Sequence, residues 1–338
     1  MGDQFQLLFA LDAGNLEGFI GLPGAAGMIA RLETEDVFWE YLQLTERDFS
    51  DEEGRTADPA FIPRALRRRI MDGDAENGRN LKHREQNRRE QNARERIIVT
   101  DRSALAQALT ENEICVIGFQ HGAEAGSFFQ GTELVLFSFE DLDAAFFRNV
   151  LKHFHHLPVY IAETERLVLR ESIAEDFDAI FRMSRELTPD ATTDAFSGDP
   201  EAEREKFLRY IQYAYSFFGF GLWTVLERQS GAVIGRCGLM PAADRRTPEG
   251  RVELGYLIAR EMRGKGYALE ACRAVLDFAF RELECGEIYA GIGGGNTESI
   301  RLARRLGFSR EDDPGEAGSG YSTDLWKLTA EEYEKESC

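Results

Sequence analysis

The residues best suited to chemistry in this sequence form a glycine turn, RGKGYA, at residues 263–268. An apolar strand pattern at residues 252–259 leads into the turn, and apolar residues at helical spacing follow it as far as Leu283. Glycine lets a backbone approach a ligand closely, and amide N–H groups at the start of a helix converge on phosphate oxygens. The segment is therefore either an anion site or a purely structural turn, and the glycines alone do not distinguish the two. It is not a Walker A loop, which ends in Gly-Lys-Ser/Thr, nor a dinucleotide fingerprint, because Leu269 takes the place of the third small residue.

The elements around this turn are predicted from periodicity and turn chemistry. Residues 164–170 alternate apolar and polar types, as a strand does, and an apolar stripe at helical spacing follows them. Asp199 and Pro200 suit the cap and the first position of a second helix. Two apolar runs between residues 222 and 235, separated by a Gln-Ser-Gly turn, then predict a hairpin.

The sequence of the N-terminal half predicts a separate small α/β domain with a parallel sheet, because short apolar strand patterns alternate with amphipathic stretches. This half faintly resembles a Rossmann-like domain. Strands are predicted at residues 5–12, 96–101, 114–119 and 134–137, and helices at residues 35–44, 103–111 and 142–155. Residues 51–96 form a charged insert that is either a solvated helix or disordered. Pro158 follows the last helix. We therefore expect an N-terminal domain at residues 1–158 and a C-terminal domain at residues 159–338.

The composition of the chain limits the kinds of partner that we expect it to bind. The 338 residues carry a formal net charge of −20, which disfavours binding to nucleic acid. This charge either attracts cationic partners such as polyamines or only aids solubility. The five cysteines are widely spaced, so we expect no disulfide framework and no metal site. No apolar run is long enough to span a membrane and the first residues lack a signal sequence, so we expect a cytoplasmic protein without a membrane partner.

Several motifs in the C-terminal half together resemble the GNAT superfamily of N-acetyltransferases, and especially its RimJ/RimL-like branch of ribosomal-protein acetyltransferases. The motifs follow the family's order between Thr164 and Tyr333: a hairpin at residues 219–239, ELGY at 253–256, RGKGYA at 263–268, NTESIR at 296–301 and LGF at 306–308. The resemblance implies a mixed, mostly antiparallel central sheet flanked by helices. It also implies that acetyl-CoA is the cosubstrate and that a primary amine accepts the acetyl group.

The resemblance also implies roles for particular residues. The pyrophosphate of acetyl-CoA would lie on the glycine turn, and the pantetheine arm would follow the preceding strand. The implied cofactor-binding residues are Leu257, Ile258, Ala259, Arg263, Gly264, Lys265, Gly266, Tyr267, Ala268, Asn296 and Ser299. Glu253 is the candidate base for direct attack by the amine, unless it forms a structural salt bridge. Many relatives use a tyrosine acid where this sequence has Ala303, and Tyr256 is the weak substitute.

The sequence leaves the acceptor open between a small cationic amine and a protein N-terminus. The resemblance implies that the acceptor enters near the first two helices, where Phe217, Phe218, Phe220 and Trp223 either line its path or pack in the core.

Two other functions stay open as well. One is a non-catalytic CoA-binding sensor whose N-terminal domain contacts a partner. The other follows from a faint resemblance of the N-terminal half to haloacid dehalogenases, with Asp12 at the place of their nucleophile. That family has a second aspartate two residues on, where this sequence has Gly14. We therefore expect the N-terminal half to be an accessory domain.

Overall fold

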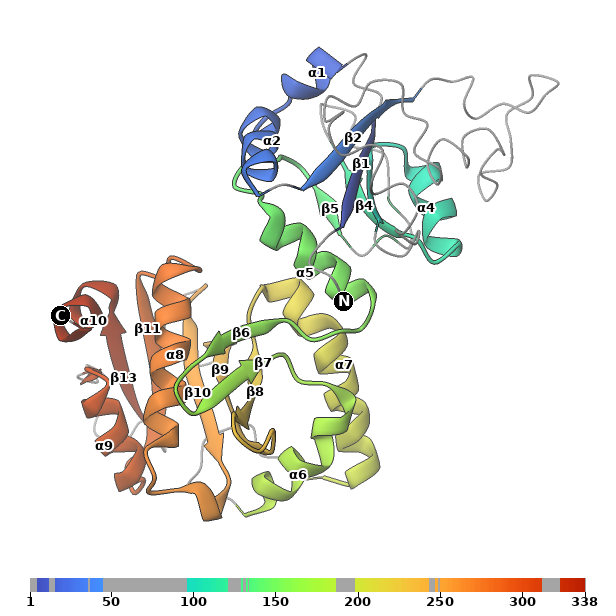
Figure 1. The fold of residues 1–338 in the computed structure, drawn as a ribbon. Coiled ribbons are helices and arrows are strands. Elements are labelled where there is room, and N and C mark those ends of the chain that lie inside the picture. Colours follow the sequence, from blue (N-terminus) through green and yellow to red (C-terminus); the bar gives the residue numbers. More distant parts are fainter. Residues whose placement is uncertain are drawn as a thin grey trace. The chain divides into compact units, whose positions relative to one another are not determined.

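The computed structural model divides the chain into two compact units, Met1–His156 and Leu157–Cys338 (Figure 1). The structure describes residues 5–11, 16–35, 37–44, 96–120, 129, 132, 134–186, 198–242, 247–248, 250–311 and 323–337. Asp12 lies outside these ranges, as does the predicted charged insert except for Arg96. Each unit has its own sheet and its own apolar core.

The N-terminal unit is built on a parallel sheet with the strand order β2-β1-β3-β4-β5. Its strands are β1 (Gln6–Leu11), β2 (Phe38–Gln43), β3 (Arg96–Thr100), β4 (Cys115–Phe119) and β5 (Val135–Leu136), and its helices are α1 (Leu16–Ile20), α2 (Ala25–Thr34), α4 (Ser103–Glu111) and α5 (Ala144–Phe154). Successive residues of β1 pack on opposite faces: Phe9 shares a core with Met28 of α2, and Leu8 shares one with Leu105 of α4. The prediction of a small parallel α/β domain is confirmed.

One prediction in this unit is wrong. The helix predicted at residues 35–44 is strand β2, and the helix lies earlier, at Ala25–Thr34. Four consecutive residues of β2, from Trp39 to Leu42, are buried beside β1. A strand covered on both faces carries large side chains at every position, so its pattern resembles that of a short buried helix.

The C-terminal unit is built on an eight-stranded sheet with the order β12-β13-β11-β10-β9-β8-β7-β6. Its strands are β6 (Tyr160–Glu163), β7 (Leu167–Arg170), β8 (Leu222–Glu227), β9 (Val233–Pro241), β10 (Val252–Ile258), β11 (Glu287–Gly293), β12 (Ser309–Arg310) and β13 (Thr323–Thr329), and its helices are α6 (Phe177–Arg185), α7 (Pro200–Phe218), α8 (Tyr267–Arg281), α9 (Thr297–Arg305) and α10 (Ala330–Ser337). All neighbouring strands are antiparallel except β10 and β11, which are parallel. The mixed, mostly antiparallel sheet is thus confirmed.

The strand predicted at residues 164–170 is shorter than expected. Strand β7 begins at Leu167, because the preceding three residues form the turn from β6, closed by a 2.9 Å hydrogen bond from the Thr164 amide to the Leu167 carbonyl. The cap predicted for α7 is confirmed, with the Asp199 carboxylate accepting from the Ala202 amide and Pro200 in the first position.

Helices cover both faces of this sheet, and Figure 1 shows α8 lying across one of them. Helix α8 shares a core with Trp223 and Cys237, whereas α6 and α7 share a core with Leu257. Directly paired residues of neighbouring strands point to the same face. Arg236, which pairs with Leu257, therefore faces α6 and α7.

Candidate functional site

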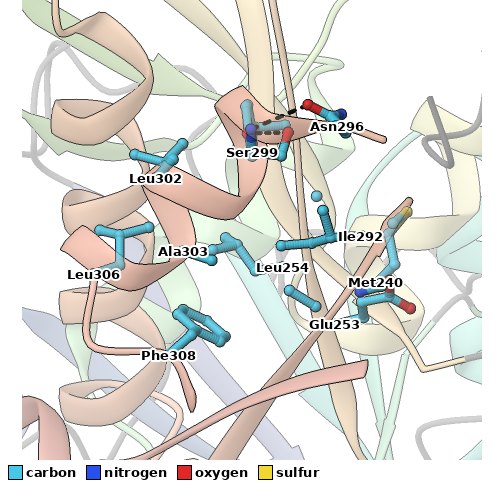
Figure 2. Close-up of a pocket in the computed structure, with 14 residues that line it drawn as sticks. Met240, Glu253, Leu254, Ile292, Asn296, Ser299, Leu302, Ala303, Leu306 and Phe308 are labelled. Carbon is cyan, nitrogen blue, oxygen red and sulfur yellow. Dashed lines mark hydrogen bonds between the residues drawn. The ribbon is translucent and has the colours of Figure 1, made fainter. Parts of the chain in front are cut away.

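The candidate site begins where the parallel strands β10 and β11 separate. They pair only at Val252 and Glu253 of β10, although the strands continue to Ile258 and Gly293. A cavity lies in this split, lined by both strands and by α9 (Figure 2). Beyond Glu253, β10 makes no ladder with β11 in the described residues. An extended ligand can therefore take the place of a strand along that edge.

The glycine turn predicted at residues 263–268 follows the end of β10. Gly264 and Gly266 have φ values of 72° and 86°, a left-handed conformation that glycine adopts without strain. Gly266 is the N-cap residue of α8, and no side chain caps the helix. The amides of the first turn are therefore available to an anion. No atom lies within 4 Å of the position that a Cβ of Gly264 would take, so the turn is open to a ligand.

A polar cluster anchors this turn to the edge of the sheet. The Glu270 carboxylate, in the first turn of α8, accepts hydrogen bonds from the Thr164 hydroxyl (2.6 Å) and from the amide (2.9 Å) and Nε (2.7 Å) of Arg166. Arg166 also donates to the Lys265 carbonyl (3.0 Å) and lies over the ring of Tyr267 at 4.5 Å. Burial opposes ionisation of Glu270, but the hydrogen bonds from Thr164 and Arg166 outweigh it and lower its pKa.

Glu253 lies at the point where the two strands separate. Its Oε1 accepts a 2.8 Å hydrogen bond from the backbone N–H of Gly291 on β11. The side chain is half-buried and lines the cavity beside Met240, across from α9 in Figure 2. A Cβ at Gly291 would lie only 2.9 Å from the same oxygen. The glycine therefore allows the carboxylate to sit at the cavity.

Three predicted residues come together at the start of α9. The Tyr256 hydroxyl donates to the Ser299 hydroxyl at 2.7 Å, and the Ser299 amide donates to the side chain of Asn296, the N-cap residue, at 3.1 Å. Burial raises the pKa of Tyr256, so its hydroxyl stays protonated at neutral pH. Ala303 lines the same cavity and offers no hydroxyl. The hydroxyl groups on this side of the cavity therefore come from Tyr256 and Ser299, and Figure 2 shows Ser299 beside Asn296 at the start of α9.

The other predicted cofactor-binding residues, at the end of β10 and in the glycine turn, mostly contact other parts of the protein. The Ala259 amide already donates to the Ile234 carbonyl (2.9 Å), and the Ile258 carbonyl accepts from Nε of Arg263 (3.0 Å). Arg263 thus folds back on β10 and braces the turn, whereas the exposed Lys265 points its ammonium towards Met262. Leu257 packs in the core with α6 and α7, so its side chain is directed away from the open edge.

The aromatic residues considered for the acceptor path separate into two groups. Trp223 is buried in the core that includes α8 and therefore packs on the face opposite to α6 and α7. Phe217 and Phe218 at the end of α7 are exposed, by 79% and 43%, and their rings contact each other. Phe220 is half-buried and contacts Phe218.

Two further findings concern metals and membranes. Within the part of the chain that the structure describes, no group of three or more His, Cys, Asp or Glu side chains is arranged to hold a metal ion. In those same ranges, none of the helices has the length and apolar character needed to cross a membrane.

Comparison with known proteins decides the family. Residues 166–309 match the acetyltransferase (GNAT) domain family. YkkB of Bacillus subtilis, an uncharacterized protein, is 33% identical over 119 residues, which cover 35% of this chain and 68% of YkkB. This chain belongs to the GNAT acetyltransferase family.

Two further relatives of this GNAT acetyltransferase have names that mention an acceptor. The putative ribosomal N-acetyltransferase YdaF of Bacillus subtilis is 35% identical over 75 residues, 22% of this chain and 41% of YdaF. The spermidine N(1)-acetyltransferase of Escherichia coli is 30% identical over 78 residues, 23% of this chain and 42% of that enzyme. The match to this family identifies the chain as an acyltransferase, and the family implies acetyl-CoA as its cosubstrate.

Sequence reasoning missed the Glu270 cluster and the contact between Glu253 and Gly291. The hydrogen bonds of Glu270 to Thr164 and Arg166 span 106 and 104 residues, and that of Glu253 to Gly291 spans 38. The only sequence signal was an acidic residue in the first turn of a helix, which a favourable interaction with the helix dipole already explains.

Proposed function

We propose that this acetyltransferase binds acetyl-CoA along the split between β10 and β11 and transfers the acetyl group to a small primary amine. The observation that carries the proposal is that the open edge of β10 leads, after a short 3-10 helix at Arg260–Met262, into the uncapped glycine turn of α8. An extended pantetheine arm suits the edge, and a pyrophosphate suits the amides of Gly264, Gly266, Tyr267 and Ala268. Bound there, acetyl-CoA supplies the activated acetyl thioester.

Glu253 acts as the base in this proposal. A primary amine is mostly protonated at neutral pH and must lose a proton before its nitrogen can attack a carbonyl carbon. Glu253 is held at the cavity by Gly291 and accepts that proton, directly or through water. A backbone N–H of β10 stabilises the oxyanion that forms during attack.

The hydroxyl groups of Tyr256 and Ser299 serve the leaving group. As the new C–N bond forms and the C–S bond breaks, the sulfur takes up negative charge and then a proton. Ser299 and Tyr256 form a hydrogen-bonded pair on the cavity wall that can supply that proton. This pair takes the role of the general acid, which Ala303 cannot fill because its side chain carries no proton donor.

A small cationic amine is supported as acceptor over a protein N-terminus by two observations. The net charge of −20 attracts cations, and one relative is named for spermidine. The putative ribosomal enzyme among the relatives supports the other acceptor class.

The test is thiol release from acetyl-CoA with a panel of amines and N-terminal peptides, measured for the wild type, Glu253→Gln and Glu287→Gln. Glutamine keeps an acceptor for the Gly291 amide, so Glu253→Gln removes the base and preserves the contact. We expect kcat/KM to fall by about 10²- to 10⁴-fold in Glu253→Gln. Glu287→Gln removes a β11 carboxylate that pairs with Arg251 at 2.8 Å and should leave the rate unchanged. Binding of acetyl-CoA without turnover on any acceptor would instead favour a CoA-binding sensor.

A further inference from the structure

Two buried arginines lie in one row on the face of the sheet that α6 and α7 cover. Arg170 pairs with Thr224, and Thr224 pairs in turn with Arg236. Each arginine is 7% exposed. Arg170 forms a bidentate ion pair with Asp176, with distances of 2.7 and 2.8 Å. The row thus contains two equally buried guanidinium groups, and Arg170 is paired with a carboxylate.

Arg236 lacks such a partner. Its Nη2 donates to the Leu222 carbonyl at 3.3 Å, and its guanidinium lies 5.6 and 5.3 Å from the rings of Phe207 and Tyr210. Its Nε is buried without any hydrogen-bond partner. Across the ranges that the structure describes, Arg236 forms no ion pair, and the nearby Asp176 is bound to Arg170 and Thr224 instead.

This arrangement is unusual for a buried charge. A charge removed from water is normally paired, because its desolvation is otherwise uncompensated. The two aromatic rings offset part of that cost through cation–π attraction, but they do not use the N–H groups. An arginine fork presents parallel donors that match a carboxylate. Among the described residues Arg236 thus has no anionic partner, and its Nε is an unused donor.

Arg236 lies on the same face of the sheet as the candidate base. Its partner Leu257 is four residues beyond Glu253 on β10, and side chains four residues apart on a strand share a face. The guanidinium reaches the Leu222 carbonyl, in the row that contains Gly255. That row is two residues from Glu253, or about 7 Å along the strand, and Leu222 on β8 lies two strands, or about 10 Å, across the sheet from β10. Arg236 is not among the residues that line the cavity beside Glu253, so an acceptor has to run along this face of the sheet to reach both side chains.

We propose that Arg236 binds a carboxylate of the acceptor, so that the acceptor carries a primary amine and a carboxylate on the order of 10 Å apart. A monoanion matches a single guanidinium, because Arg170 is already neutralised by Asp176. The inference rests on the proposed acetyl transfer at Glu253.

Acceptors that differ only in the carboxylate test this proposal. The pairs are 6-aminohexanoate with 6-aminohexanamide, and lysine with lysinamide. We expect wild-type kcat/KM to be about 10-fold or more higher for the acids than for their amides, as for a charge-assisted hydrogen bond. Arg236→Gln should remove that preference, mainly by raising KM for the acids, and change kcat/KM for the amides by less than about twofold.

Tyr215→Phe is the matched control. The Tyr215 hydroxyl donates to the same Leu222 carbonyl at 2.8 Å, so this variant loosens Leu222 but keeps the guanidinium. It should affect acids and amides equally. An equal loss for both classes in Arg236→Gln would show that Arg236 only positions β8 and would overturn the inference.

If Arg236→Gln does not fold, the kcat/KM values of the wild type for acids and amides still test the proposal. Equal kcat/KM for acids and amides, or no turnover with any acid, would overturn the assignment of Arg236. In both cases turnover with other amines would leave the proposed acetyl transfer standing. Absence of turnover with every amine of the wider panel would count against the proposed function itself.

Discussion

At the scale of single residues, the hydrogen-bonded hydroxyls of Tyr256 and Ser299 should act as one unit. We expect Tyr256→Phe and Ser299→Ala each to lower kcat by roughly 10-fold, and the double variant to lose little more than either single one. Burial raises the pKa of Tyr256. A tyrosine is protonated below its pKa, so this group should cause no alkaline loss of kcat up to its ordinary value of about 10.

Steady-state kinetics of the four proteins, measured between pH 6 and about 10, check this prediction. Tyr333→Phe is the control, since its hydroxyl donates to the Arg273 carbonyl on α8 and is not among the residues lining the cavity. Independent losses that multiply in the double variant would show that the two hydroxyls do not work together.

At Gly291, the addition of a single Cβ atom should disturb the candidate base. In Gly291→Ala the new Cβ would meet Glu253 Oε1 at 2.9 Å and displace the candidate base. We expect kcat to fall by about 10-fold or more, while the affinity for acetyl-CoA changes little. Gly286→Ala is the matched change just before the same strand, because nothing lies within 4 Å of its Cβ position. Kinetics and calorimetry on both variants separate the two effects, and equal rates would mean that Glu253 tolerates displacement.

Much of this residue-scale picture follows from the sequence. The resemblance implied that Glu253, Tyr256, Asn296 and Ser299 belong to one site, and all four line one cavity in the structure. The contact of Glu253 with a backbone amide was not predictable, because backbone donors occur at nearly every residue and strand register selects among them. Arg236 was equally hidden, since a sequence does not show which arginine lacks a carboxylate.

At the scale of elements, Glu270 joins the glycine turn of α8 to the turn between β6 and β7. Replacing it by glutamine should loosen the amides that face the anion and raise the Kd for acetyl-CoA by roughly threefold to fivefold. The lowered pKa of Glu270 also sets a pH dependence. Its stabilisation is present above the ordinary carboxyl pKa of about 4.3 and is lost as the pH falls through the lower folded value.

Thermal unfolding of the wild type and Glu270→Gln as a function of pH measures this linkage. The difference in Tm should be constant near neutrality and vanish at acidic pH. Glu331→Gln is the control, because Glu331 pairs with Lys335 within the same helix and its side chain is 81% exposed. Its loss should leave Tm unchanged at every pH. A Tm difference for Glu270→Gln that persists in acid would point to packing rather than charge.

The elements themselves were predictable where local chemistry dominates. Helix α4 has the predicted bounds, and α7 starts at the predicted Asp-Pro cap. Strand β2 was not recognised as a strand, because burial on both faces removes the alternation on which strand prediction depends. The separation of β10 from β11 was not predictable from local sequence, since no local pattern marks where two strands cease to pair.

At the scale of the whole molecule, each unit has its own hydrophobic core, which consists of two clusters of buried apolar residues. We assign the N-terminal unit the role of an accessory domain, because the residues placed at the proposed site all belong to the C-terminal unit. The residues that face the proposed pyrophosphate and pantetheine also lie within Leu157–Cys338.

This assignment predicts the behaviour of residues 157–338 produced alone. The fragment should unfold in one cooperative transition, because its sheet and both of its apolar clusters are complete without the first unit. It should bind acetyl-CoA with a Kd within about threefold of the full chain, a difference of less than ~1 kcal/mol. Calorimetry on the fragment and the full chain measures both quantities, and Gly264→Ala in each serves as the control for binding at the glycine turn. A fragment that folds but binds acetyl-CoA much more weakly would show that the N-terminal unit contributes to the site, and the accessory assignment would then have to be abandoned.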